Sequence, residues 1–168
     1  MCERSNVNQV YDNETEVDVL YVQSQAGWKW IKRTDWKDWT KKGKAWAMEG
    51  LADRYTDGAG VKQSDEKAIE FNEMAAERGN ATAQYNLGQF YKQGTRGLTQ
   101  SYKRAFELYT LAAEQELAEA QYGLGLMYVN GDGIETSYSK AREWWTKAAA
   151  QGNKNAIKAL RLLDESGR

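Results

Sequence analysis

Few residues of this chain have the chemistry that catalysis requires. The sequence contains no His, so it lacks the commonest general base, the commonest zinc ligand and any Ser-His dyad. Its only Cys is Cys2, which leaves no disulfide framework and no Cys cluster for a metal. One carboxylate pair, Glu49 and Asp53, is spaced to share a helix face, but such pairs are commonplace on protein surfaces. We therefore expect no catalytic residue, no metal site, no cofactor and no enzymatic activity.

A second chemical feature is a concentration of Trp and basic residues before residue 47. Five of the seven Trp lie within 28–46, and the stretch from Lys29 to Lys44 holds seven cations and two Asp. This composition suits nucleic acid, an anionic membrane surface or an acidic protein partner, and equally a cap over the end of a helical array. We favour the cap, and we list four Trp as a secondary partner-binding surface: Trp28, Trp30, Trp36 and Trp39. The net charge of −1 argues against a strongly polycationic nucleic-acid binder, so we expect no nucleic-acid partner.

The elements that position these residues follow from an internal repeat. Three segments, starting at Ala47, Ala83 and Ala120, read AMEGLADRYTDGAG, AQYNLGQFYKQGTRG and AQYGLGLMYVNGDG. A fourth start follows at Ala156, and the four starts are 36, 37 and 36 residues apart. A fixed period of this size predicts a solenoid, in which each unit buries its apolar face against its neighbours.

Each unit reads as two helices joined by a turn with paired glycines. We expect first helices at 44–57, 81–93, 118–130 and 154–165, and second helices after three equivalent N-caps, Ser64, Ser101 and Ser137. The sequence has no Pro, which suits uninterrupted helices. The expected fold is an all-α solenoid of helix-turn-helix repeats, with an N-terminal extension and cap over 1–43. The solenoid covers 44–168, with repeats at about 44–80, 81–117 and 118–153 and a partial unit at 154–168.

The pattern A-x-x-x-L-G-x-x-Y-x-x-G-x-G-[VI]…K-A…A-A-x-x-G resembles Sel-one-like repeats, which are relatives of the tetratricopeptide repeat. The resemblance covers 44–168 and is most specific in AEAQYGLGLMYVNGDGIETSYSKAREWWTKAAAQGN. It implies a right-handed superhelix that binds other proteins in adaptor, regulatory or virulence roles. Three features depart from the pattern: Ala52 in place of a helix Gly, the stretched GTRG turn, and Glu116-Leu117 in place of Gly-Asn.

One face of the first helices carries the candidate binding residues. With Leu87 at the centre of the buried face, Tyr85, Gln89 and Lys92 fall on the opposite side of the helix. The resemblance places this face on the concave surface of the superhelix; the alternative is that packing between helices buries it. We call the following set the A-helix stripe: Trp46, Glu49, Asp53, Tyr85, Gln89, Lys92, Tyr122 and Leu126. In the last second helix, we expect Trp144 in the core and Trp145 at its edge.

The N-terminal 43 residues match no recognised pattern. We expect a flexible start over 1–16, a hairpin or extended segment over 17–31, and a short Trp-rich helix from Thr34. Cys2 is either a chance residue after the initiator or the first residue of a mature bacterial lipoprotein. The second interpretation predicts a periplasmic protein that meets the membrane only through a lipid anchor at Cys2; the alternative location is the cytoplasm.

Together these features indicate a protein-interaction module. The resemblance includes a bacterial subgroup of immunity proteins that neutralise secreted antibacterial effectors, among them phospholipase-type toxins of contact-dependent (type VI) secretion systems. We interpret the chain as such an immunity protein. The alternative is a general cytoplasmic scaffold or adaptor that holds a peptide or protein in its groove. The sequence does not specify the partner or the oligomeric state.

Overall fold

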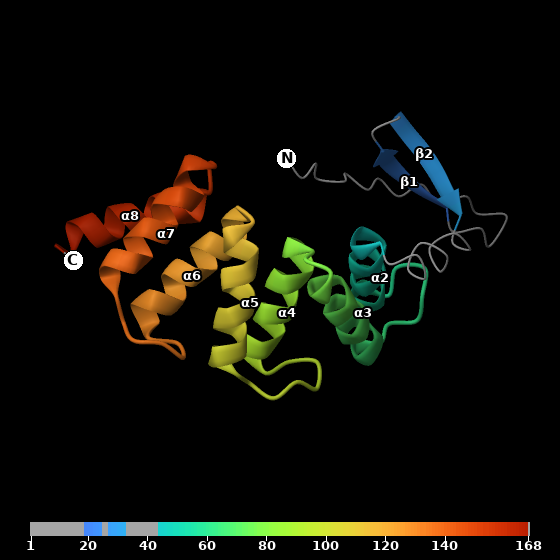
Figure 1. The fold of residues 1–168 in the computed structure, drawn as a ribbon, viewed down its shortest axis with the longest axis horizontal. Helices are drawn as coiled ribbons and strands as arrows, with labels where there is room; N and C mark the ends of the chain where they lie inside the picture. Colours follow the sequence, from blue (N-terminus) through green and yellow to red (C-terminus); the bar gives the residue numbers. More distant parts are fainter. Residues whose placement is uncertain (1–18, 25–26, 33–43, 168) are drawn as a thin grey trace.

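The computed structural model describes residues 19–24, 27–32 and 44–167, and within these ranges it shows a hairpin followed by seven helices (Figure 1). The hairpin pairs β1 (Val19–Ser24) with β2 (Gly27–Lys32) in antiparallel register. The helices are α2 (Ala45–Asp57), α3 (Asp65–Glu77), α4 (Ala81–Gln93), α5 (Tyr102–Glu114), α6 (Ala118–Asn130), α7 (Tyr138–Ala150) and α8 (Lys154–Glu165). The start predicted for 1–16 and the helix predicted from Thr34 lie outside the described residues.

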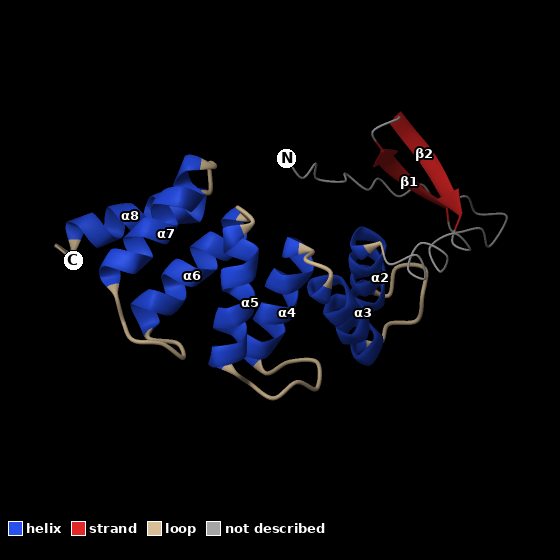
Figure 2. Ribbon diagram, viewed as in Figure 1, coloured by secondary structure: helices blue, strands red, loops and turns tan. Residues whose placement is uncertain are grey.

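The seven helices stack side by side in a curved row from α2 to α8 (Figures 1 and 2). We call α2, α4, α6 and α8 the A helices, and α3, α5 and α7 the B helices. Each A helix packs against the B helix before it and the B helix after it, where these are present. This arrangement confirms the helical-repeat solenoid predicted from the 36-residue period.

Local signals set the ends of the helices. Each B helix begins after a serine whose hydroxyl accepts a hydrogen bond from the backbone N–H three residues on: Ser64, Ser101 and Ser137. The first three A helices end at glycines with φ between +65° and +74°, which are Gly58, Gly94 and Gly131. A side chain at such a position is strained, so glycine fixes where the chain leaves the helix.

The turn between α5 and α6 departs from this pattern. The equivalent turns before α4 and α8 contain Gly79 and Gly152, with φ of +81° and +83°. In the turn before α6, this position is Glu116, which adopts φ +64° although it is not a glycine. The following residue, Leu117, provides no side-chain cap, whereas Asn80 and Asn153 cap α4 and α8 through their Oδ1 atoms. The turn therefore keeps the backbone conformation of the other repeats at a cost in conformational energy for Glu116, because the packing of α5 and α6 against each other imposes that conformation.

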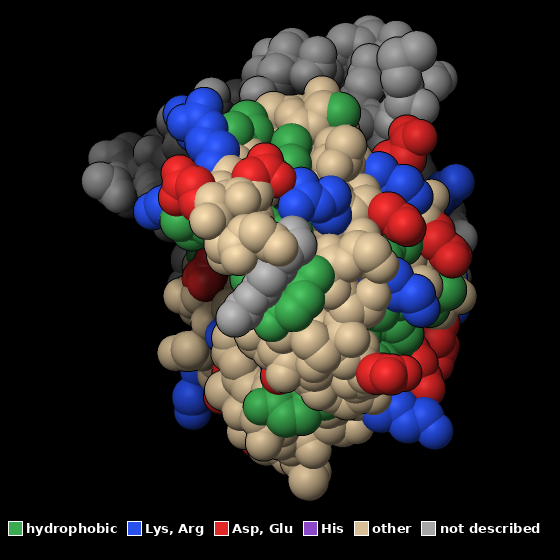
Figure 3. Space-filling model, turned by 90° about the vertical axis from the view of Figure 1, so that its left-hand side faces the viewer, with side chains coloured by type: hydrophobic (Ala, Val, Ile, Leu, Met, Phe, Trp, Pro, Cys, Tyr) green, Lys and Arg blue, Asp and Glu red, His purple; other side chains and the backbone are tan. Residues whose placement is uncertain are grey.

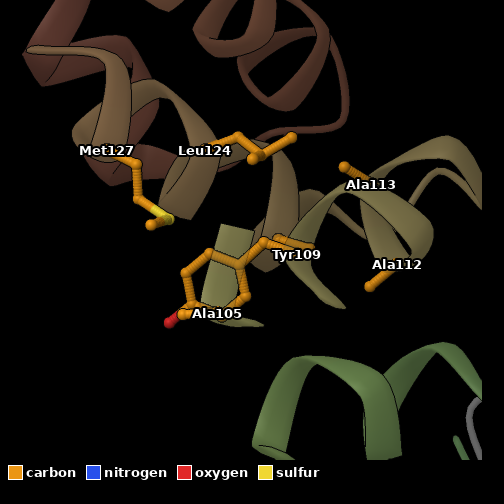
Figure 4. Close-up of a cluster of buried hydrophobic side chains, with 7 residues drawn as sticks. Ala105, Tyr109, Ala112, Ala113, Leu124 and Met127 are labelled. Atoms are coloured by element: carbon orange, nitrogen blue, oxygen red, sulfur yellow. The ribbon is translucent and has the colours of Figure 1, made fainter. Parts of the chain in front are cut away.

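A glycine in the A helix makes room for a large aromatic side chain of the B helix. Tyr109 and Trp145 are 4% and 5% exposed. A Cβ built on Gly88 would lie 2.6 Å from Tyr109 Cδ1, and one built on Gly125 would lie 2.1 Å from Trp145 Nε1. Figure 4 shows the cluster around Tyr109, which α6 completes with Leu124 and Met127. The absence of a side chain at each glycine thus leaves the space that the ring of Tyr109 or Trp145 fills.

The placement of Trp145 at the edge of the core was wrong. Trp145 is buried, while Trp144 is only partly buried and Lys147 lies over its ring. The first repeat has Ala52 where the later repeats have Gly88 and Gly125. The residue opposite Ala52 is Asn72, which is smaller than its equivalents Tyr109 and Trp145. A short side chain needs no glycine opposite it, so Ala52 is tolerated.

Buried glutamines join consecutive repeats. Gln84 Nε2 donates to the carbonyl of Ala76 at 3.1 Å, and its Oε1 accepts from Gln115 Nε2 at 2.8 Å. The next repeat has the same two bonds, from Gln121 to Ala113 and from Gln151 to Gln121, at 3.2 and 2.9 Å. The accepting carbonyls lie in the last turn of a B helix, and each also accepts a hydrogen bond from a backbone N–H of the following turn, Gly79 or Glu116. Each glutamine thus adds a second hydrogen bond that links the end of one repeat to the next.

Candidate protein-binding site

The A-helix stripe is partly packed and partly open. In its middle, the Tyr85 ring stacks on Tyr109 with 5.2 Å between ring centroids. Burial raises the pKa of Tyr85; a hydrogen bond with Gln89 opposes this shift, and the charges of Glu119 and Tyr122 add to it. The stripe residues of α4 and α6 are therefore close to one another, and they form one surface rather than separate patches.

Tyr122 and Leu126 continue this surface along α6. The Tyr122 ring stacks on Trp145 with 6.3 Å between centroids, and its carbonyl accepts a hydrogen bond from Trp145 Nε1 at 3.1 Å. Leu126 and Val129 are partly buried beside them. Both stripe tyrosines therefore contribute to packing between helices, as the alternative interpretation of the stripe proposed. Tyr122 also lines the groove described next.

An open groove of about 440 Å³ lies between α6 and α8, above Trp145 of α7. We call it the C-terminal groove. Tyr122, Leu126 and Val129 form one wall, and α8 contributes Lys158 and Leu162 to the other. Leu162 is 56% exposed, the largest exposed fraction of any large hydrophobic residue in the described part of the chain. The groove combines an apolar floor, an accessible leucine and one ammonium group.

The sequence-based site did not include Lys158 and Leu162. They occupy the repeat positions of Tyr122 and Leu126, 36 residues further on. Extending the repeat register into the fourth unit would have identified them. The repeat motif is harder to recognise in α8, because this helix lacks the Tyr and Gly residues of the motif. Figure 3 looks onto this end of the molecule, where hydrophobic side chains surface in small areas among charged ones.

At the other end of the stripe, α2 presents a column of acidic residues beside Trp46, which is 36% exposed. Burial, and secondarily the charge of Asp53, raises the pKa of Glu49 from its usual 4.5 to about 7. Burial raises the pKa of Asp53 as well, with Asp57 adding repulsion. The Glu49 side chain is partly buried, whereas the Asp53 side chain keeps more contact with solvent, so its carboxylate is only partly desolvated. These carboxylates are spaced along one face of α2, four residues apart.

The remaining candidate residues are distributed differently. Lys92 forms an ion pair with Asp132 at 3.2 Å, so its charge is used within the fold. Trp28 and Trp30 lie on β2, and Trp36 and Trp39 lie outside the described residues. In the described ranges, no group of three or more Cys, Asp or Glu is placed to bind a metal ion. No helix between residues 44 and 167 has the length and hydropathy needed to cross a membrane.

The fold and its stripe define a helical-repeat scaffold, and comparisons with known proteins give the family. The model of the Sel1 repeat matches residues 47–80, 81–117 and 118–153. The chain therefore belongs to the Sel1 repeat family, whose members are protein-interaction modules on a fold that is generally non-enzymatic. No curated protein matches the chain.

Three solved structures show the same architecture. A Sel1 repeat protein from Oxalobacter formigenes is 39% identical with a TM-score of 0.73, over 76% of this chain and 96% of that one. The protein c5321, a protective antigen present in uropathogenic Escherichia coli strains, displays an SLR fold; it is 33% identical with a TM-score of 0.75, over 79% of this chain and 28% of that one. Helicobacter pylori cysteine rich protein B shares the fold at 21% identity and a TM-score of 0.59, over 75% of this chain and 95% of that one.

Proposed function

We propose that this chain binds another protein along the A-helix stripe, with the C-terminal groove as the main contact. The observation that carries this proposal is the groove itself, where an exposed Leu162 stands over partly buried Tyr122 and Leu126. Accessible apolar side chains beside a well-packed aromatic floor are typical of interface residues with large binding energies. The groove lies on the surface formed by the A helices, as the stripe hypothesis requires.

Leu162→Asp tests this proposal more cleanly than substitution of the stripe tyrosines. Tyr85 and Tyr122 stack on buried rings, so their loss would weaken the fold and the interface together. A matched control is Leu111→Asp, because Leu111 is 48% exposed but lies on the B helix α5. We expect Leu162→Asp to weaken binding of the native partner at least about tenfold and Leu111→Asp to leave it unchanged. Equal affinities for both variants would refute the site.

For the specific role, we propose that the partner is a secreted antibacterial effector, which this chain neutralises by occlusion. The resemblance to the immunity subgroup supports this, together with a sequence that has no His and a single Cys. Co-expression with the products of neighbouring genes tests it. One of these products should stop growth when expressed alone, and this chain should restore growth. Binding without any toxic partner would instead favour the general scaffold or adaptor.

For the location, we propose that Cys2 is the lipid-modified first residue of the mature protein in the periplasm. The support is a single Cys followed by the stretch ERSNVNQVYDNETE, whose composition is polar and low in hydrophobicity, as in the segment that links a lipid anchor to a domain. Metabolic labelling with a fatty acid, using the full native gene, provides the test. We expect the wild-type protein to be labelled and the Cys2→Ser variant to remain unlabelled. An unlabelled wild-type protein in the cytoplasm would refute the anchor.

A further inference from the structure

We propose that the stripe holds an extended segment of its partner in one direction. A bulky apolar residue and an acidic residue of that segment lie at the α8 end, and a basic residue lies at the α2 end. This inference rests on the proposed function and specifies the chemistry of the partner at the same site. Three features of the structure support it: the charge of the groove, the opposite charge of α2, and the surface between them, whose charged residues are partly buried or ion-paired.

At the α8 end, Lys158 is the single charged residue among the described residues that line the groove. Its side chain is exposed and forms no ion pair within the described part of the chain. In the two preceding repeats the same position is a tyrosine. An ammonium beside Leu126 and Leu162 favours a carboxylate that follows or precedes a large apolar side chain. The groove volume of about 440 Å³ is within the range of roughly 300–1,000 Å³ that ligand pockets occupy.

At the α2 end, Asp53 carries charge of the opposite sign, and Glu49 adds to it above about pH 7 or when a bound cation favours its ionised form. Neither forms an ion pair with another described residue, and Glu49 is partly buried. Two carboxylates one helical turn apart repel each other, so a cation placed between them lowers the free energy of the site. The α2 end therefore favours Lys or Arg of the partner, next to the accessible ring of Trp46.

Among the described residues between these ends, one further acidic residue, Glu119, is partly buried and acts on Tyr85 through its charge. Tyr85 and Gln89 are hydrogen-bonded to each other, and Lys92 is paired with Asp132. The exposed charges of the stripe that are not ion-paired with another described residue, Asp53 and Lys158, thus lie at its two ends. Successive A helices are bridged by a B helix that packs against both, and contacting helices have axes about 8–10 Å apart, so we take the distance from α2 to α8 to be on the order of 30 Å. An extended chain covers that distance with about nine residues.

Synthetic nine-residue peptides test the inference with the full chain. The probe is a fluorescent peptide with two lysines at one end and a tryptophan next to a glutamate at the other. It is made in both chain directions, together with a version in which the glutamate is replaced by lysine. Fluorescence anisotropy measures binding to the wild-type chain, to Lys158→Glu, and to the matched control Lys103→Glu on α5.

We expect one chain direction to bind at least about fivefold more tightly than the other. Lys158→Glu should weaken binding of the glutamate peptide by about tenfold, and the lysine peptide should recover most of that loss on this variant. Lys103→Glu should change nothing. Equal binding of both directions, no binding at about 1 mM, or no effect of Lys158→Glu would overturn the inference. If Leu162→Asp still abolishes binding of the native partner in that case, the proposed function stands and only the charge-directed orientation fails.

Discussion

Replacing Gly125 by Ala tests whether the A-helix glycine exists to accommodate Trp145. A Cβ at this position would lie 2.1 Å from Trp145 Nε1, whereas ordinary contacts begin at 3.4 Å, so the indole must move by more than an ångström. That movement would break the hydrogen bond from Nε1 to the carbonyl of Tyr122, which is 3.1 Å long. It would also deform the floor of the C-terminal groove, because Trp145 lines it.

The expected cost follows from three contributions. Overpacking a core by one methyl group costs about 1–3 kcal/mol, and the lost hydrogen bond adds about 1 kcal/mol. Ala is favoured over Gly within a helix by about 1 kcal/mol, which offsets part of this. We therefore expect Gly125→Ala to lower the free energy of unfolding by about 1–3 kcal/mol. For a chain of this length that corresponds to a lower melting temperature by about 3–10 °C.

Urea and thermal unfolding followed by circular dichroism measure this change, and a double-mutant cycle assigns its cause. Trp145→Leu removes the ring atoms that the new Cβ would meet, so in that background Gly125→Ala should be neutral or stabilising. The coupling energy should reach about 2 kcal/mol. Ala52→Gly is the matched control, because Asn72 replaces the aromatic residue there; the helix-propensity cost of about 1 kcal/mol and the loss of one buried methyl group, about 0.8 kcal/mol, are expected. If Gly125→Ala costs the same with and without the Trp145 ring, the proposed role of glycine is wrong.

Two further changes follow from the strained turn and the acidic face. Glu116→Gly should raise the free energy of unfolding by about 1 kcal/mol in urea titrations, because glycine adopts φ +64° without strain; a destabilised variant would show that Glu116 makes a compensating contact. Glu49 has a pKa of about 7 in the fold against 4.5 when exposed, so the folded chain binds more protons between these values and its stability falls as pH rises from 4.5 to 7. Glu49→Gln should therefore be more stable than wild type by about 1–3 kcal/mol at pH 8 and nearly equal at pH 4. A difference that does not change with pH would contradict this assignment.

Local chemistry explains why the helices were predictable. Ser64, Ser101 and Ser137 cap the B helices, and glycines of positive φ end the first three A helices, so these boundaries depend on residues within a few positions. The error at Trp145 has a non-local cause. Two adjacent tryptophans reach similar distances toward the core, and the space that selects Trp145 is created by Gly125 on a different helix.

The helical phase of the stripe tyrosines was predictable from the sequence, but their contacts were not. Helical phase placed Tyr85 and Tyr122 on one face, as the structure does. Their stacking on Tyr109 and Trp145 depends on how closely neighbouring helices approach, which no periodicity within one helix specifies. The ion pair of Lys92 with Asp132 likewise joins consecutive repeats.

The central claim is that a protein partner lies on the surface of the A helices and fills the C-terminal groove. Hydrogen–deuterium exchange of the chain, alone and bound to its native partner, tests this most directly. We predict slower amide exchange on binding in α6 and α8, over residues 118–130 and 154–165, with no change in the B helix α5, over 102–114. Protection confined to α5 and the other B helices, or to the hairpin of β1 and β2, would contradict the claim.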